Sequence, residues 1–177
     1  MTPTTVIHPD RLLLLAALLE KDAAKPTGLK FDLGMWAAPA DDTKRSWDRS
    51  DLGVTDTQMH DGVVTKLPEV SCGTMGCALG FAALSGEFAK YGLGMTYAVT
   101  FSGNIDLLPV CNDREGFDAG EELFGISYET SCYLFDPDCY DDTPRGAEGE
   151  LEVAQRIRAL VDGEIEDEYH PALNGNY

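Results

Sequence analysis

The sequence predicts an α-rich α+β fold, a single domain of about four helices with a small β-hairpin. Three observations lead to this expectation. The chain has 177 residues, close to the usual size of one domain, and 44% of them are hydrophobic, enough to form a core. Apolar residues repeat at helical spacing in several segments, and two short apolar segments flank a Ser-Gly-Asn turn. We expect residues 1–163 to form the domain and residues 164–177 an acidic tail.

The first expected helix covers residues 11–22. Leu12, Leu15 and Leu19 repeat at helical spacing, and Pro9 suits a first helical turn because that turn needs no backbone N–H from it. The segment after it, residues 31–36, is short and apolar. We expect it to form either a strand or an irregular plug in the core.

Residues 37–67 are rich in polar residues and predict a long surface loop. Trp47 lies here among basic neighbours that include Arg45, and both are candidates for contact with a partner. The alternative is that Trp47 packs back onto the domain. His60, next to an aspartate, is a candidate catalytic base.

The stretch from Cys72 to Gly80 is rich in small residues. We expect Thr74 to cap a helix that has Cys77 in its first turn. The helix N-terminus would then lower the pKa of the Cys77 thiol, which makes it a candidate nucleophile. The run is similar to the Cys-Gly-Ser-Cys-Trp motif of papain-like peptidases, with an extra residue and Ala78 in place of Trp. The base would be His170 or His60; the alternative is a stretch that serves close packing.

The second half of the chain predicts a hairpin and three helices. The hairpin joins residues 96–101 to residues 105–110. Asn112 and Glu115 resemble a capping box for a helix that ends at Gly125, and Ser127 caps the next helix, which runs through residue 134. The last helix starts at Thr143-Pro144 and stops at Gly163.

An acidic turn precedes the last helix. Four carboxylates fall within seven residues, and oxygen-rich loops of this kind bind hard cations: Asp136, Asp138, Asp141 and Asp142. The spacing lacks the glycine and glutamate of an EF-hand, and a solvated turn is the alternative. The five cysteines do not form a disulfide or zinc pattern, so we expect reduced thiols and no cofactor.

The charge of the chain is strongly acidic. The sequence has 31 Asp and Glu against 13 Lys and Arg, a net charge of −18, and from residue 112 onward 18 acids face four arginines. The electrostatic field of this negative charge disfavours direct binding to nucleic acid or anionic membranes and favours a basic protein partner. Candidate contact residues in the tail are Glu164, Glu166, Asp167 and Glu168. No apolar run is long enough to span a bilayer, and we expect a cytoplasmic protein of undefined oligomeric state.

Several segments, in this order, resemble a family of small uncharacterised proteins of tailed phages and prophage-like bacterial regions. They are Phe31–Trp36, Cys72–Gly80, Leu123–Ser127, Leu134–Pro137 and Val153–Val161, with Cys-Gly-Thr-x-x-Cys-Ala-x-Gly as the central motif. The resemblance implies a phage or mobile-element context and carries no catalytic role.

We therefore expect a non-enzymatic, acidic protein-interaction protein in the cytoplasm of a host cell or in a virion. It would act as a virion component or as a modulator of a host factor, with mimicry of nucleic acid as one mode. The alternative is a cysteine-dependent hydrolase that uses Cys77 as its nucleophile.

Overall fold

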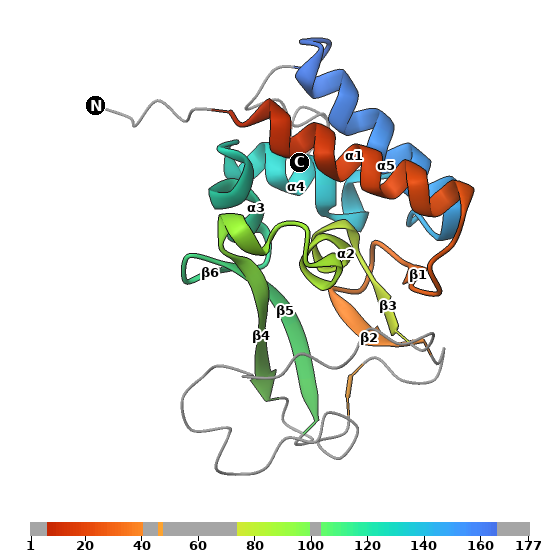
Figure 1. Cartoon of the computed structure of the whole chain (residues 1–177), viewed down its shortest axis with the longest axis vertical. Coiled ribbons are helices and arrows are strands. Elements are labelled where there is room, and N and C mark those ends of the chain that lie inside the picture. Colours follow the sequence, from red (N-terminus) through yellow and green to blue (C-terminus); the bar gives the residue numbers. More distant parts are fainter. Residues whose placement is uncertain (1–6, 41–45, 48–73, 100–103, 166–177) are drawn as a thin grey trace, which may run out of the picture.

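In the computed structural model, which describes residues 7–40, 46–47, 74–99 and 104–165, two long helices lie side by side at one end of the molecule (Figure 1). They are α1 (Pro9–Ala24) and α5 (Gly146–Val161). They run antiparallel, so that Asp22 near the end of α1 meets Glu150 near the start of α5. Glu20 of α1 also forms an ion pair with Arg158 of α5 (2.7 Å). Pro9 occupies the first turn of α1, as predicted.

A small sheet lies on the opposite side of α2 (Ala78–Ser85) from these helices (Figure 1). Its strands are β1 (Lys30–Phe31), β3 (Thr74–Gly76) and β2 (Ala37–Pro39), in that order across the sheet. β1 pairs with β3 in parallel and β2 pairs with β3 antiparallel. Residues 37–39 are therefore buried strand and not the start of a surface loop; most of the rest of the predicted loop lies outside the described residues.

The predicted hairpin is confirmed and is longer than expected. β4 (Leu93–Val99) follows a short 3₁₀ helix, η1 (Ala89–Tyr91), and pairs antiparallel with β5 (Ile105–Cys111) along its whole length. Alternate residues of β5 are buried, so one face of the hairpin covers the core. A third strand, β6 (Arg114–Glu115), pairs with the end of β5.

The capping box predicted at Asn112 is wrong. Asn112 and Asp113 both have positive φ (48° and 68°) and form the two-residue turn between β5 and β6, as expected for a hairpin turn of the I′ type. Helix α3 (Phe117–Phe124) begins only after Gly116.

Two short helical elements follow α3, namely α4 (Tyr128–Phe135) and the 3₁₀ helix η2 (Pro137–Cys139). The cap predicted for α4 is confirmed, because the Ser127 hydroxyl accepts a hydrogen bond from the Thr130 N–H (3.1 Å).

The start predicted for the last helix is displaced. Pro144 lies before α5, where its carbonyl accepts a hydrogen bond from the Leu33 N–H (3.0 Å). The helix begins at Gly146, after Arg145, and ends before Gly163 as predicted.

The five helices and two sheets share one hydrophobic core. α2 is buried at every position from Ala78 to Leu84, and Phe88, Phe124 and Phe135 are fully enclosed. The fold is thus the predicted mixed α+β domain, with five helices instead of about four and with a second sheet that was not predicted. None of the helices in the described residues combines the length and apolar character needed to cross a bilayer.

Candidate functional site

The Cys77 thiol does not occupy the position predicted for it. Thr74 lies in strand β3 and caps no helix; its buried hydroxyl has no hydrogen-bond partner within the described residues. Cys77 is itself the N-cap of α2, with extended backbone geometry, and its sulfur accepts a hydrogen bond from the Gly80 N–H (3.3 Å). The thiol is therefore a helix cap and is not in the first turn.

Burial outweighs the helix N-terminus in setting the acidity of this thiol. Cys77 is only 1% exposed. Desolvation raises the pKa of the thiol to about 12, although backbone N–H groups of α2 act in the opposite direction. The predicted lowering of this pKa is thus wrong, and Cys77 is a protonated thiol at neutral pH.

The segment of residues 31–37 wraps closely around the Cys77 turn. Phe31 pairs with Gly76, and the Met35 carbonyl accepts a hydrogen bond from the Cys77 N–H. The carbonyl of Trp36 lies so close to Gly80 that a Cβ atom there would stand 1.7 Å from its oxygen. The apolar segment 31–37 therefore packs against the small-residue turn at residues 74–80, in agreement with the packing alternative for this stretch.

No histidine contacts the Cys77 thiol within the described residues. His8 lies at the start of α1, where its backbone N–H donates to the Phe124 carbonyl (2.7 Å), and it makes no hydrogen bond with the thiol. His60 and His170 lie outside the described residues.

In the acidic turn at 136–142, an aspartate side chain forms a hydrogen bond with the backbone of the turn itself. Asp136 accepts a hydrogen bond from the Asp138 N–H (2.9 Å) and caps η2, which is the turn-forming role given as the alternative. Asp141 and Asp142 are exposed. Within the described part of the chain, no group of three or more His, Cys, Asp or Glu side chains is placed to hold a metal ion.

Trp47 packs onto the domain and is not displayed at the surface. It is 8% exposed, its backbone bridges to Ile105, and its indole N–H donates to the Ala37 carbonyl (3.3 Å). Glu164 is exposed just after α5. The other predicted contact residues lie outside the described residues: Arg45, Glu166, Asp167 and Glu168.

An exposed aromatic ring lies among acids at the start of α4. Tyr128 is 47% exposed and makes an edge contact with Phe117 (ring centroids 6.5 Å apart). A hydrogen bond with the Cys132 side chain raises the pKa of the Tyr128 phenol, and the nearby carboxylates of Asp118 and Asp136 add to this rise. With Glu129, which also acts on Cys132, these residues form what we call the Tyr128 patch: Asp118, Tyr128, Glu129 and Asp136.

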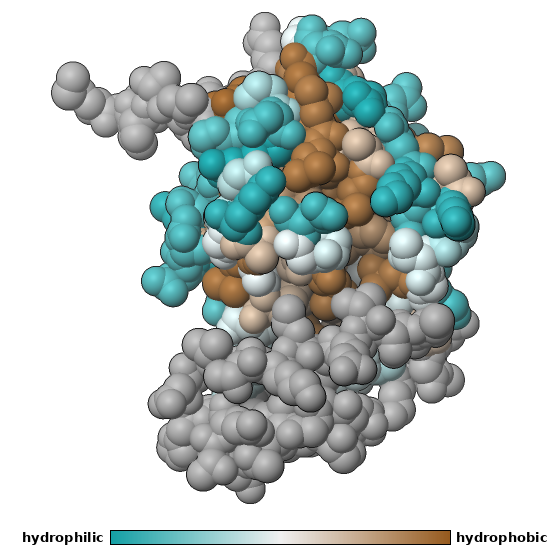
Figure 2. All heavy atoms as spheres, in the orientation of Figure 1, coloured by the Kyte–Doolittle hydropathy of each residue, from teal (hydrophilic) through white to brown (hydrophobic). Residues whose placement is uncertain are grey.

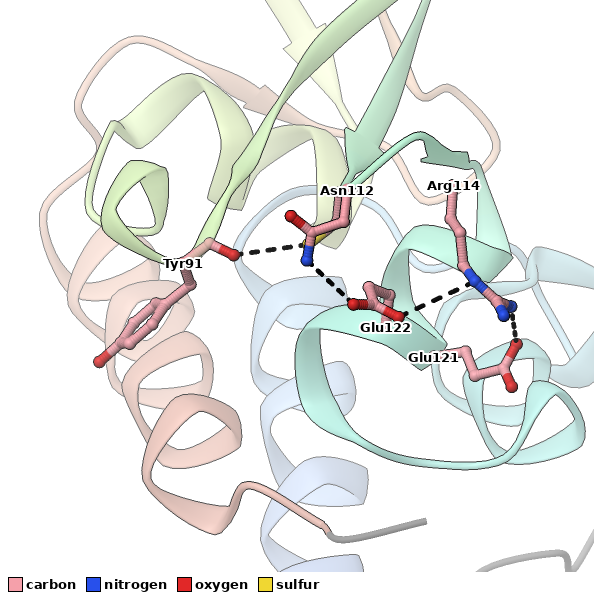
Figure 3. A network of polar contacts seen from close by, with 6 residues as sticks. Tyr91, Asn112, Arg114, Glu121 and Glu122 are labelled. Carbon is pink, nitrogen blue, oxygen red and sulfur yellow. Dashed lines mark hydrogen bonds and ion pairs between the residues drawn. The ribbon is translucent and has the colours of Figure 1, made fainter. Parts of the chain in front are cut away.

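The arginines near the acid-rich half of the chain are held in internal contacts. Arg114 reaches from β6 to two acids of α3, Glu121 (3.0 Å) and Glu122 (3.8 Å), and Asn112 donates to Glu122 (2.9 Å) in the same network (Figure 3). This network ties the turn between β5 and β6 to α3.

The other three arginines of this half are also engaged. Arg145 pairs with Asp32 (3.0 Å) and Arg158 pairs with Glu20. Arg156 donates to two backbone carbonyls and lies 3.4 Å from the centre of the Tyr140 ring. The four arginines of this half are therefore all engaged in contacts within the fold.

A buried pair of carboxyl groups joins α1 to α5, and sequence patterns gave no signal for it. Asp22 and Glu150 are each 3% exposed and are hydrogen-bonded through their side chains. Burial, followed by the charge of Asp22 and this hydrogen bond, raises the pKa of Glu150 to about 8. Glu150 therefore holds a proton at neutral pH and donates it to Asp22.

Comparison of the chain with family models, curated proteins and solved structures gave no significant match.

Proposed function

We propose that this chain is a non-enzymatic interaction protein whose acidic surface binds a basic protein partner. The observation that carries the proposal is the net charge of −18, concentrated in the second half of the chain. A field of this sign attracts basic surfaces and repels nucleic acid and anionic lipid. We further propose a phage-associated role, as a virion component or as a modulator of a host factor in the host cytoplasm, on the basis of the sequence resemblance alone.

The internal use of arginine supports this proposal. Arg114, Arg145, Arg156 and Arg158 are all committed to contacts within the fold. Because these arginines are engaged within the fold, they are not free to pair with the other exposed acids of this half, whose charge we propose is available to a partner.

The Tyr128 patch is the docking point that we propose for the partner. An exposed tyrosine among carboxylates offers a ring face and several acceptors to an incoming arginine or lysine. Tyr128 is one of two large hydrophobic residues exposed in the described structure; the other is Leu151.

The hydrolase alternative has no specific support. A nucleophilic cysteine needs an accessible thiolate with a base in reach, and Cys77 is buried with a pKa of about 12.

The experiment is affinity capture from host extract with the immobilised chain at low and at high salt. The patch variant carries Tyr128→Ser and Glu129→Lys together. We expect wild type to capture a basic protein at low salt, and high salt or the patch variant to reduce that capture by about tenfold or more. Mass spectrometry of purified virions then separates a virion component from a host-factor modulator.

A matched control exists on α5, where an exposed apolar residue also precedes an exposed acid. The control variant carries Leu151→Ser and Glu152→Lys, and we expect it to capture the partner as wild type does. Capture that persists unchanged at high salt would contradict the charge-driven mode. Equal loss in both variants would rule out the Tyr128 patch as the docking point.

A further inference from the structure

A pocket of about 290 Å³ opens between α1 and the end of α2. Its apolar wall is formed by Leu18, Leu29, Phe81 and Leu84. In the orientation of Figure 1, a strip of apolar side chains reaches the surface between polar ones over α1 and α5 (Figure 2). The volume is near the lower limit for small-molecule sites, which begin at about 300 Å³.

The pocket also has a buried carboxyl group in its lining. Asp22 contributes to the wall and is 3% exposed. It accepts a hydrogen bond from the Thr27 N–H (2.7 Å) and another from the side chain of Glu150 behind it. Lys21 and Glu87 also line the pocket, and their opposite charges offset each other. The negative charge of Asp22 is thus the unbalanced charge of the pocket.

The Asp22–Glu150 pair holds a proton that a cation can displace. Asp22 is the charged group that acts on Glu150. The other charged residues on the helices and strands packed against this pair are at least partly exposed: Asp10, Arg11, Glu20 and Lys21 of α1, Glu148, Glu152, Arg156 and Arg158 of α5, Lys30 of β1 and Glu129 of α4. A positive charge next to Asp22 would lower the cost of ionising Glu150, so that binding and proton release are coupled.

We propose that this pocket binds a small primary alkylammonium ion, with its alkyl chain on the apolar wall and its ammonium group on Asp22. The apolar wall favours a carbon chain over a hydrated metal ion. The carboxyl pair favours a cation over a neutral or anionic ligand because its negative charge is shielded from water. This site is separate from the Tyr128 patch, and its proposal does not rest on the proposed function.

The test is titration calorimetry of the whole chain with hexylamine, with hexanol and methylamine as comparison ligands. The buffers must have different ionisation enthalpies and contain no primary amine. We expect one hexylamine per chain, with proton release that makes the measured enthalpy depend on the buffer. Affinity should rise between about pH 6 and pH 8, as the proton on Glu150 becomes easier to remove. Hexanol lacks the charge and methylamine lacks the chain, so both should bind at least about tenfold more weakly.

Two variants locate the site. Asp22→Asn keeps the acceptor for Thr27 but removes the charge, and we expect hexylamine to bind at least about tenfold more weakly. Glu150→Gln should keep binding but lose proton release. Asp10→Asn and Glu152→Gln are matched controls, since both acids are exposed on the same two helices, and each should bind as wild type does.

The comparison of ligands on wild type stands even where Asp22→Asn does not fold. Equal binding of hexylamine and hexanol, no binding of hexylamine, or unchanged binding by folded Asp22→Asn would overturn the proposal. None of these outcomes bears on capture of a basic protein at the Tyr128 patch, which the variants at residues 128 and 129 test.

Discussion

Gly80 lies where α2 crosses the backbone of Trp36, and the crossing leaves no space for a side chain. A Cβ atom at Gly80 would stand 1.7 Å from the Trp36 carbonyl oxygen and 2.9 Å from its carbon. Because the obstacle is backbone, Gly80→Ala must displace either α2 or the segment before β2. We expect this variant to lower the free energy of unfolding by about 3 kcal/mol or more in urea denaturation.

Gly94 provides the control for this substitution. It lies in strand β4, and a Cβ atom built there meets nothing within 4 Å. We expect Gly94→Ala to change the free energy of unfolding by less than about 1 kcal/mol. Equal effects of the two substitutions would show that the close crossing at Trp36 is not what requires glycine at position 80.

The Cys77 thiol gives a second prediction at this scale. Since it is 1% exposed with a pKa of about 12, iodoacetamide at pH 8 should leave it unmodified in the folded chain. Peptide mass spectrometry should find it fully modified after unfolding in urea, which controls for the chemistry itself. Rapid modification of Cys77 in the folded state would restore the nucleophile hypothesis.

Among the helices and strands, local signals in the sequence predicted some boundaries and failed at others. The cap at Ser127 was predictable because a cap depends on residues next to each other in the chain. Asn112 carries the same kind of signal, yet it forms a strand turn, since Asn suits both caps and positive φ. The pairing of β5 with β6 decides between the two roles, and such pairing is a tertiary property.

The strands of the smaller sheet could not be predicted for another reason. β1, β2 and β3 have only two or three residues each, too few to show alternation of apolar and polar side chains. The Asp22–Glu150 pair could not be predicted either, because its two residues are far apart in the sequence. The pair exists only once α1 and α5 have packed together.

The α1–α5 contact makes stability depend on pH through Glu150. Its pKa is about 8 in the folded chain against a usual value of 4.5. Between these values the unfolded chain has released the proton and the folded chain retains it, so this residue makes stability fall as pH rises. Above about pH 8 its effect becomes constant. The slope is at most about 1.4 kcal/mol per pH unit.

Glu150→Gln should remove the loss of stability that this residue causes as pH rises. The Gln amide can still donate a hydrogen bond to Asp22 but carries no titrating proton. We expect the variant and wild type to differ little near pH 4 and the variant to become the more stable of the two towards pH 8. Urea denaturation across this range measures the difference. Glu152→Gln, an exposed acid two residues away, should run parallel to wild type. A constant difference between Glu150→Gln and wild type would contradict the raised pKa.

For the whole molecule, the excess of acid sets the response to salt. The net charge of −18 makes the folded state repel itself, and salt at about 0.1 M already screens charges beyond about 10 Å. The ion pairs Arg158–Glu20 and Arg145–Asp32 act in the other direction, because salt weakens them. Both are partly exposed, and such pairs contribute about 1 kcal/mol or less each.

Repulsion should therefore dominate, and sodium chloride should raise the free energy of unfolding by an amount on the order of 1 kcal/mol. Replacing two exposed acids by Asp141→Lys and Asp142→Lys should stabilise the chain at low salt and reduce the effect of salt, since it lowers the same repulsion. Urea denaturation at several salt concentrations measures both effects. Stability that falls with salt would mean that the internal ion pairs outweigh the surface charge, and the acids would then be balanced within the fold instead of being available to a partner.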